Sequence, residues 1–337
     1  MRKFILAVVL LIGVMFIIMN FAEVQAIVET LKRGEILYLV LGLGVLLLWM
    51  LNVAASYQAI YRSIGLDETI KNLLPVTAAA NFVNIVTPSA GMSGMAVFVA
   101  EAHRRNYSSG RAAAAGTLDV LFDYGAFLGV LGLGLIILIR RHDLNAGELV
   151  ATGILVALAL LLIFLVYLGV KSAEALGNVL AWMARQINRL LRPLIHREYL
   201  SEKRAREFAC DAAEGLREIS EAPNKLILPI FLASCKFTLL ITILYLCFLA
   251  FKVPVSPGTL IAGFSIAYLT LIVSPTPSGI GFVEGALTLS LSSMYIPLSA
   301  ATVVTLTYRG ITFWIPLLLG MIAFRWLGGA KNIKAAL

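Results

Sequence analysis

Residues 85–89 read IVTPS and lead to Gly94, and residues 272–276 read IVSPT and lead to Gly281, 187 positions later. Both copies lie inside apolar runs. Proline removes a backbone hydrogen-bond donor and glycine adds conformational freedom, so we expect each copy to interrupt a helix. Irregular backbone at membrane depth is tolerated only where protein buries it or water lines it. Two matching breaks in the two halves of a chain are typical of a transporter built from an inverted repeat.

The composition around these breaks is that of an integral membrane protein. Over 337 residues, 60% are hydrophobic, 14% are charged and the mean hydropathy is +0.91, values outside the range of soluble globular domains. We expect a single membrane domain, 1–337. Six apolar runs approach or exceed the roughly 20 residues that cross a bilayer as helix: 4–22, 36–55, 115–139, 149–170, 226–251 and 298–324. The first is interpreted as a retained anchor, because its apolar core is longer than that of a signal peptide.

The two regions that carry the breaks, 73–100 and 259–296, each consist of two short apolar arms. If both regions are hairpins that return to the side they entered, 20 of the 27 Lys and Arg residues face one side, 5 face the other and 2 lie within apolar runs. This asymmetry satisfies the positive-inside rule and predicts that both termini are cytoplasmic. The lengths of the arms leave re-entrant and fully spanning hairpins both open.

The predicted fold class is therefore an all-α polytopic membrane protein with about six spanning helices plus two broken helical hairpins in an inverted repeat. The first repeat unit covers 36–139 and the second covers 226–326, and their hairpins should enter from opposite faces and meet near the midplane. Residues 171–225 form the expected amphipathic linker on the cytoplasmic side. Its basic residues either gather anionic lipid or only follow the charge rule.

Five ionisable residues inside the apolar runs are candidates for a substrate site, because a charge at the centre of a membrane helix is costly and is usually retained for a partner or a pathway. They are Asp119, Asp123, Lys236, Glu284 and Arg309. Asp119 and Asp123 are four residues apart and share a helix face. One reading is that these charges only neutralise one another between helices. The other is that Arg309 binds a phosphate while the carboxylates hold an amine or a proton. Glu284 is either a first-turn acid or a substrate ligand.

The breaks themselves add backbone amides and hydroxyls to this site. A half-helix that starts after Gly94 or Gly281 presents free N–H groups that bind anions. The neighbouring polar and break residues are Pro88, Ser89, Ser93, Thr276 and Ser278. The competing reading is a kink that only lets helices pack.

Residues 277–284, which read PSGIGFVE and contain Gly279, and the later Tyr308-Arg309 resemble the flippase-like membrane domain of lysylphosphatidylglycerol synthases, the membrane half of the multiple peptide resistance factor, which also occurs alone. Residues 87–94, which contain Gly91, resemble the break in the first half of that domain. The resemblance covers nearly the whole chain. It implies translocation of a phospholipid, such as an aminoacylated phosphatidylglycerol, or of a related polar lipid.

The leading hypothesis is a lipid translocase of the prokaryotic cytoplasmic (inner) membrane that holds the headgroup between two opposed hairpins. The alternative is a non-catalytic membrane partner that scaffolds a separate lipid-modifying enzyme. We expect no enzymatic activity, cofactor, metal or nucleic-acid partner, because Cys210, Cys235 and Cys247 lack metal-type spacing and no ATPase loop, nucleophile elbow or HExxH motif occurs. The expected partner is an anionic or aminoacylated phospholipid or a related polar lipid. The sequence leaves a homo-oligomer open.

Overall fold

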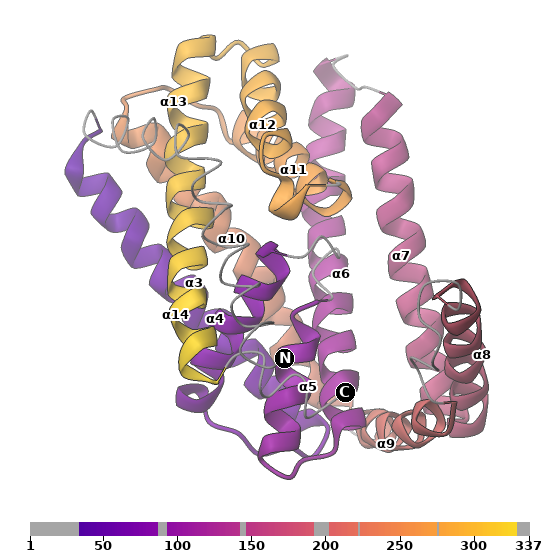
Figure 1. The fold of residues 1–337 in the computed structure, drawn as a ribbon. Coiled ribbons are helices and arrows are strands. Elements are labelled where there is room, and N and C mark those ends of the chain that lie inside the picture. Colours follow the sequence, from indigo (N-terminus) through magenta and orange to yellow (C-terminus); the bar gives the residue numbers. More distant parts are fainter. Residues whose placement is uncertain are drawn as a thin grey trace.

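The computed structural model describes residues 34–86, 93–141, 146–191, 202–221, 223–274 and 276–328 (Figure 1). These residues form helices and connecting turns, with no strand among them. Four helical segments of this part of the chain are long and apolar enough to cross a membrane: Ile36–Ser63, Ser109–Arg140, Asn224–Ala250 and Leu298–Trp326. The predicted all-α polytopic membrane fold is therefore confirmed. The expected span at 4–22 lies outside the described residues.

The first half of the molecule consists of α3 (Ile36–Ser63), α4 (Ile70–Val86), α5 (Met95–Arg104) and α6 (Ser109–Arg141). In Figure 1, α4 rises from the lower end of the molecule towards its middle, and α5 returns to that end. We call α4, residues 87–94 and α5 the first hairpin. Residues 87–92 at its tip, including Pro88, Ser89 and Gly91 of the candidate site, lie outside the described part of the chain.

The second half repeats this order of helices, and its hairpin enters the molecule from the opposite end. It comprises α10 (Ile227–Ala250), α11 (Pro257–Val273), α12 (Phe282–Ser293), α13 (Leu298–Arg309), the short π-helix η3 (Gly310–Trp314) and α14 (Ile315–Trp326). The second hairpin is α11, residues 274–281 with the 3₁₀ turn η2 (Pro277–Gly279), and α12; it descends from the upper end in Figure 1. The two hairpins thus enter the molecule from opposite ends, as the inverted arrangement requires.

The turns that lead into the two hairpins have the same geometry. The N–H of Leu66 donates to the carbonyl of Tyr61 at 2.9 Å, and the N–H of Val253 donates to the carbonyl of Phe248 at 3.0 Å. This bond closes a helix C-terminus in the Schellman manner, which requires a residue with positive φ. Gly65 supplies it with φ 73° and Lys252 with φ 55°. All three positions are 187 residues apart in the two halves, so the sequence repeat extends to the backbone turns.

Each hairpin packs its first arm closely against the last helix of the other half. A Cβ atom on Gly320 of α14 would lie 2.5 Å from the carbonyl oxygen of Ala78 on α4, and a Cβ on Gly134 of α6 would lie 2.7 Å from the Cβ of Ser265 on α11. Ala78 and Ser265 are again 187 residues apart. Small residues at matched positions therefore allow both hairpins to approach their supporting helices.

Between the halves lie α7 (Ala146–Lys171), α8 (Ala173–Leu191), α9 (Glu202–Glu221) and the turn η1 (Pro223–Leu226). With 26 residues, α7 is long enough to span a bilayer. Helices α8 and α9 pack on one another at the lower end in Figure 1. There α9 is joined to the start of α6, because Arg111 lies 3.1 Å from Glu214 and the Ser108 hydroxyl donates to Asp211 at 2.8 Å.

Two groups of buried apolar side chains hold the hairpins in place. One surrounds the second hairpin and includes Phe237, Phe264 and Leu287; the other surrounds the first hairpin and includes Phe82 and Phe98. Both groups contribute walls to the cavity that lies between the hairpins.

Candidate functional site

A cavity of about 250 Å³ lies between the inner ends of the two hairpins. The last turn of α4 lines it with Asn84 and Ile85, and the break of the second hairpin lines it with Ser274, Thr276 and Ser278. Side chains of α3, α5, α6, α10, α11, α12, α13, η3 and α14 complete the walls. The cavity is therefore built from both halves of the chain.

Seven of the predicted site residues line this central cavity: Asp119, Asp123, Lys236, Thr276, Ser278, Tyr308 and Arg309. They come from α6, α10, α13 and the second break, so the tertiary structure gathers charges that are widely separated in sequence. Five others lie next to the cavity without lining it: Ser93, Gly94, Gly279, Gly281 and Glu284.

Arg309, at the end of α13, holds the second break in its conformation. Its guanidinium Nε donates to the Glu284 carboxylate, and its Nη2 donates to the Ser278 carbonyl at 3.1 Å. The guanidinium carbon also lies 4.4 Å from the centre of the Phe313 ring, a cation–π distance. Both partners of the ion pair are largely buried, with 6% and 13% of the Arg309 and Glu284 side chains exposed. A buried charge held by this many partners positions the backbone as well as lining the cavity.

Glu284 occupies the first-turn position that the sequence predicted and bonds to both the second break and α13. It lies in the first turn of α12, and its Oε2 accepts the N–H of Gly281 at 2.7 Å. Its other oxygen binds Arg309. The break that it closes contains positive φ angles at Ser278 (48°), Gly279 (68°) and Gly281 (78°). Positive φ is costly for Ser278, so this backbone shape depends on the surrounding contacts.

The π-helix η3 begins directly after Arg309 and separates α13 from α14. Single π-turns inside α-helices are rare and occur frequently at functional sites. The Thr312 hydroxyl donates to the Tyr308 carbonyl at 2.8 Å within this turn. Tyr308, Arg309, Thr312 and Phe313 all line the cavity. The wider turn therefore directs four neighbouring side chains to one wall of the site.

The two aspartates of α6 have different partners. The Lys236 ammonium on α10 donates to Asp123 Oδ2, and both side chains are largely buried, at 17% and 18% exposed. Asp119, one turn earlier, lines the cavity together with Tyr57 of α3 and interacts electrostatically with the Tyr57 hydroxyl. The Tyr57 ring in turn stacks on Phe98 of α5, with ring centres 3.8 Å apart and planes inclined by 11°. Asp119 is thereby connected through Tyr57 to the outgoing arm of the first hairpin.

Asn84 is a site residue that the sequence analysis missed. Its side-chain oxygen accepts the Gly94 N–H at 2.5 Å and the Ser93 hydroxyl at 2.9 Å, across the first break. The amide therefore links the end of α4 to the start of α5 and lines the cavity. The available signal was a polar amide in the last turn of an apolar arm, ten residues before Gly94. A search restricted to ionisable residues does not detect it.

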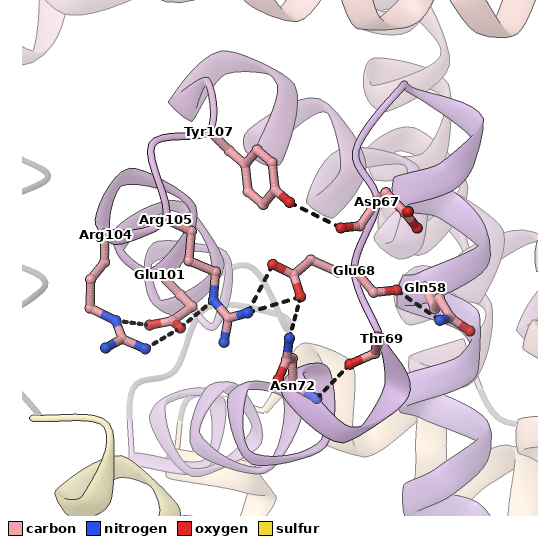
Figure 2. Close-up of polar contacts among 9 residues, drawn as sticks. All are labelled: Gln58, Asp67, Glu68, Thr69, Asn72, Glu101, Arg104, Arg105 and Tyr107. Atoms are coloured by element: carbon pink, nitrogen blue, oxygen red, sulfur yellow. Dashed lines mark hydrogen bonds and ion pairs between the residues drawn. The ribbon is translucent and has the colours of Figure 1, made fainter.

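A second polar cluster closes the outer end of the first hairpin (Figure 2). Arg105 donates to both carboxylate oxygens of Glu68, at 2.8 and 2.9 Å, and to Glu101 at 2.7 Å. Arg104 donates to Glu101 at 2.8 and 2.6 Å. Asn72 donates to Glu68 at 2.8 Å, and Gln58 of α3 donates to the Glu68 carbonyl at 2.7 Å. These bonds tie both ends of the hairpin to α3.

Burial opposes the ionisation of Glu101, but the hydrogen bonds and positive charges of Arg104 and Arg105 outweigh it. Together these effects lower the pKa of the Glu101 carboxyl below its usual value. Glu101 is thus ionised at neutral pH, and the cluster fastens the base of the hairpin.

Comparison with known proteins finds one family and two relatives that match nearly the whole chain. A family described as "Lysylphosphatidylglycerol synthase TM region" matches residues 4–320. The chain is similar to a UPF0104 membrane protein of Methanothermobacter thermautotrophicus, with 23% identity over 334 residues that cover 97% of each chain. It is also similar to the UPF0104 membrane protein MJ1595 of Methanocaldococcus jannaschii, with 26% identity over 341 residues, covering 94% of this chain and 93% of that one.

Proposed function

The chain belongs to the family of the lysylphosphatidylglycerol synthase TM region, which is related to membrane lipid, and on this basis we propose that it is a lipid translocase. It carries a phospholipid or related polar lipid between leaflets with the headgroup in the central cavity. As a carrier it makes and breaks no covalent bond. Membership of the family supports an integral membrane role related to lipid; the transport step is our own proposal.

The observation that carries this proposal is the central cavity itself. It is charged, it lies between two hairpins that enter from opposite ends, and each hairpin supplies lining residues from its inner end. Small shifts of either hairpin would open the same site towards one face or the other. Alternating exposure of a fixed site between repeats is the way in which inverted-repeat carriers work.

The size of the cavity is suited to a headgroup. Pockets that enclose a drug-sized ligand measure roughly 300–1,000 Å³, whereas this cavity measures about 250 Å³. Two acyl chains do not fit in it together with a headgroup. We propose that the acyl chains stay in the bilayer while the polar group crosses between the hairpins, so that the charge never enters bare hydrocarbon.

The sidedness of the charges supports a location in the prokaryotic cytoplasmic membrane with both termini in the cytoplasm. The basic residues of α8, α9 and the base of the first hairpin then face the cytoplasm, as the positive-inside rule favours. The base of the first hairpin carries Arg104 and Arg105, and Arg111 lies nearby in the first turn of α6.

The test is transport by the purified protein in liposomes. Fluorescent and aminoacylated lipids placed in one leaflet should appear in the other, as read by quenching with a membrane-impermeant reductant. Arg309→Ala and Glu284→Ala should each abolish this movement, because they remove the clamp that shapes the second break. Arg217→Ala, an exposed arginine on α9, is the matched control and should transport like the wild type.

Two outcomes would contradict the proposal. If wild-type protein moves no lipid but co-purifies with a lipid-modifying enzyme and raises its activity, the chain is a scaffold. If Arg309→Ala and Glu284→Ala transport at the wild-type rate, the central cavity is not the path.

A further inference from the structure

The charges of the central cavity do not balance among the described residues. Lys236 is paired with Asp123, and Arg309 is paired with Glu284. Asp119 lines the same cavity, and within the described part of the chain its polar partner is the neutral Tyr57 hydroxyl. When Asp119 is ionised, the cavity carries one negative charge that these pairs leave uncompensated.

We propose that Asp119 is the proton-binding site that couples lipid movement to the proton gradient, an inference that rests on the proposed translocase function. An unpaired charge inside a membrane protein costs free energy unless water or a partner reaches it. Water entering from an open side allows Asp119 to ionise, and closure around an empty cavity favours its protonation. One proton is bound on one side and released on the other in each cycle.

The surroundings of Asp119 favour a change of its own protonation over that of its neighbours. The titratable groups that face it are Asp123 on α6, Tyr57 on α3, Lys236 on α10 and Tyr268 on α11. Tyr308 and Arg309 of α13 line the same cavity, α5 contributes the apolar Phe98, and α7 and α9 contribute none of its lining residues among those described. Asp123 is paired with the Lys236 ammonium. Repulsion between carboxylates one turn apart is therefore relieved by protonating Asp119.

A contact path connects this proton to a moving part. An ionised carboxylate only accepts hydrogen bonds, whereas a protonated one also donates. A change at Asp119 therefore changes its interaction with the Tyr57 hydroxyl, and Tyr57 stacks on Phe98 of the first hairpin. The occupancy of the proton site is thereby transmitted to the arm that closes one side of the cavity.

The experiment uses the full chain in liposomes with a fluorescent phospholipid, with and without an imposed pH gradient. For the wild type, the steady-state ratio of lipid between leaflets should shift by about tenfold per pH unit if one proton accompanies one lipid. Asp119→Asn should lose this response, and Asp119→Glu should regain it. Asp67→Asn, whose side chain is 93% exposed, is the matched control and should respond like the wild type.

Two further readouts keep the test decisive if Asp119→Asn does not fold. A dye enclosed in the liposomes should report proton entry when lipid is added to wild-type protein. Infrared difference spectra of wild-type protein should contain a protonated-carboxyl band that titrates, and Asp119→Glu should shift it.

The outcomes separate the two proposals. If wild-type protein moves lipid but the ratio of lipid between the leaflets does not change with the pH gradient, proton coupling is overturned and the translocase function stands. If wild-type protein moves no lipid while the carboxyl band still titrates, the proton site stands and the translocase function is overturned. An Asp119→Asn variant that transports with an unchanged gradient response overturns the assignment of the proton to this residue.

Discussion

Arg309 at the end of α13 binds Glu284 in the first turn of α12, and the same carboxylate accepts the Gly281 N–H of the second break. One ion pair thus joins the helix that leads into η3 to the strained backbone at the tip of the hairpin. The buried pair is consequently a structural element of the site, in addition to the charge with which Arg309 lines the cavity.

Removing one partner of this pair should lower the free energy of unfolding more than removing both partners. Arg309→Met should lower the free energy of unfolding by about 3 kcal/mol or more, because Glu284 would remain buried without its cation. The double variant Arg309→Met, Glu284→Met should recover part of that loss. Unfolding of the detergent-solubilised proteins by SDS titration measures both effects. Equal losses in the single and double variants would show that the pair contributes little.

The glycine contacts between the two halves predict a position-specific effect. Gly320→Ala should destabilise the protein by about 1–3 kcal/mol, because the added Cβ meets the Ala78 carbonyl and backbone must shift. Gly132→Ala is the matched control, since within 4 Å of its added Cβ there is nothing among the described residues. That substitution should be neutral or stabilising, because alanine favours helix by about 1 kcal/mol over glycine. Melting temperatures in one detergent compare the two variants; similar shifts would contradict the close packing.

Asn84 should stabilise the first break through its side-chain oxygen. Asn84→Ala should cost about 1–3 kcal/mol, because the Gly94 N–H loses its acceptor. Asn84→Asp keeps an acceptor at that place and should retain more stability than Asn84→Ala. Protease cleavage near residues 87–94 should increase in Asn84→Ala alone, measured by limited proteolysis and mass spectrometry. Equal cleavage of all three proteins would remove Asn84 from this role.

The cluster at the base of the first hairpin predicts a dependence of stability on pH. Burial raises the pKa of Glu101, but Arg104 and Arg105 lower it to a net value below 4.5, the ordinary value. The contribution of Glu101 is therefore fully present above that ordinary value and is lost as the pH falls through its lowered pKa. Wild-type stability should decrease on acidification more steeply than that of Glu101→Gln. Glu174→Gln on α8, at an exposed position, should follow the wild type; thermal unfolding over a pH series provides the comparison.

Much of the architecture was predictable because its causes are local in the sequence. Long apolar runs with few charges predicted the membrane helices, four of which the structure confirms by length and composition. Pro275 and Gly281 marked the second break, where positive φ angles are found at Ser278, Gly279 and Gly281. The arrangement of hairpins from opposite ends followed from counting basic residues on the two sides, since positive charge is retained on the cytoplasmic side.

The candidate site was less predictable, because its contacts join distant parts of the chain. The sequence placed Asp119, Asp123, Lys236 and Arg309 inside apolar runs but left their pairings open. Lys236 and Asp123 are 113 positions apart, and Arg309 and Glu284 are 25 positions apart. Which cation meets which acid depends on how each helix is rotated about its axis.

The sequence by itself determined that this chain is a helical membrane protein with two interrupted hairpins, because hydropathy and helix breaking act within about twenty residues. The tertiary structure alone decided that Asn84 bridges the first break, that Gly134 and Gly320 carry the close helix contacts, and that Asp119 is left with a neutral partner beside two ion pairs. Those properties arise only when packing brings both halves around one cavity. In this interior of low polarity, each charge pairing contributes more free energy than it would in water.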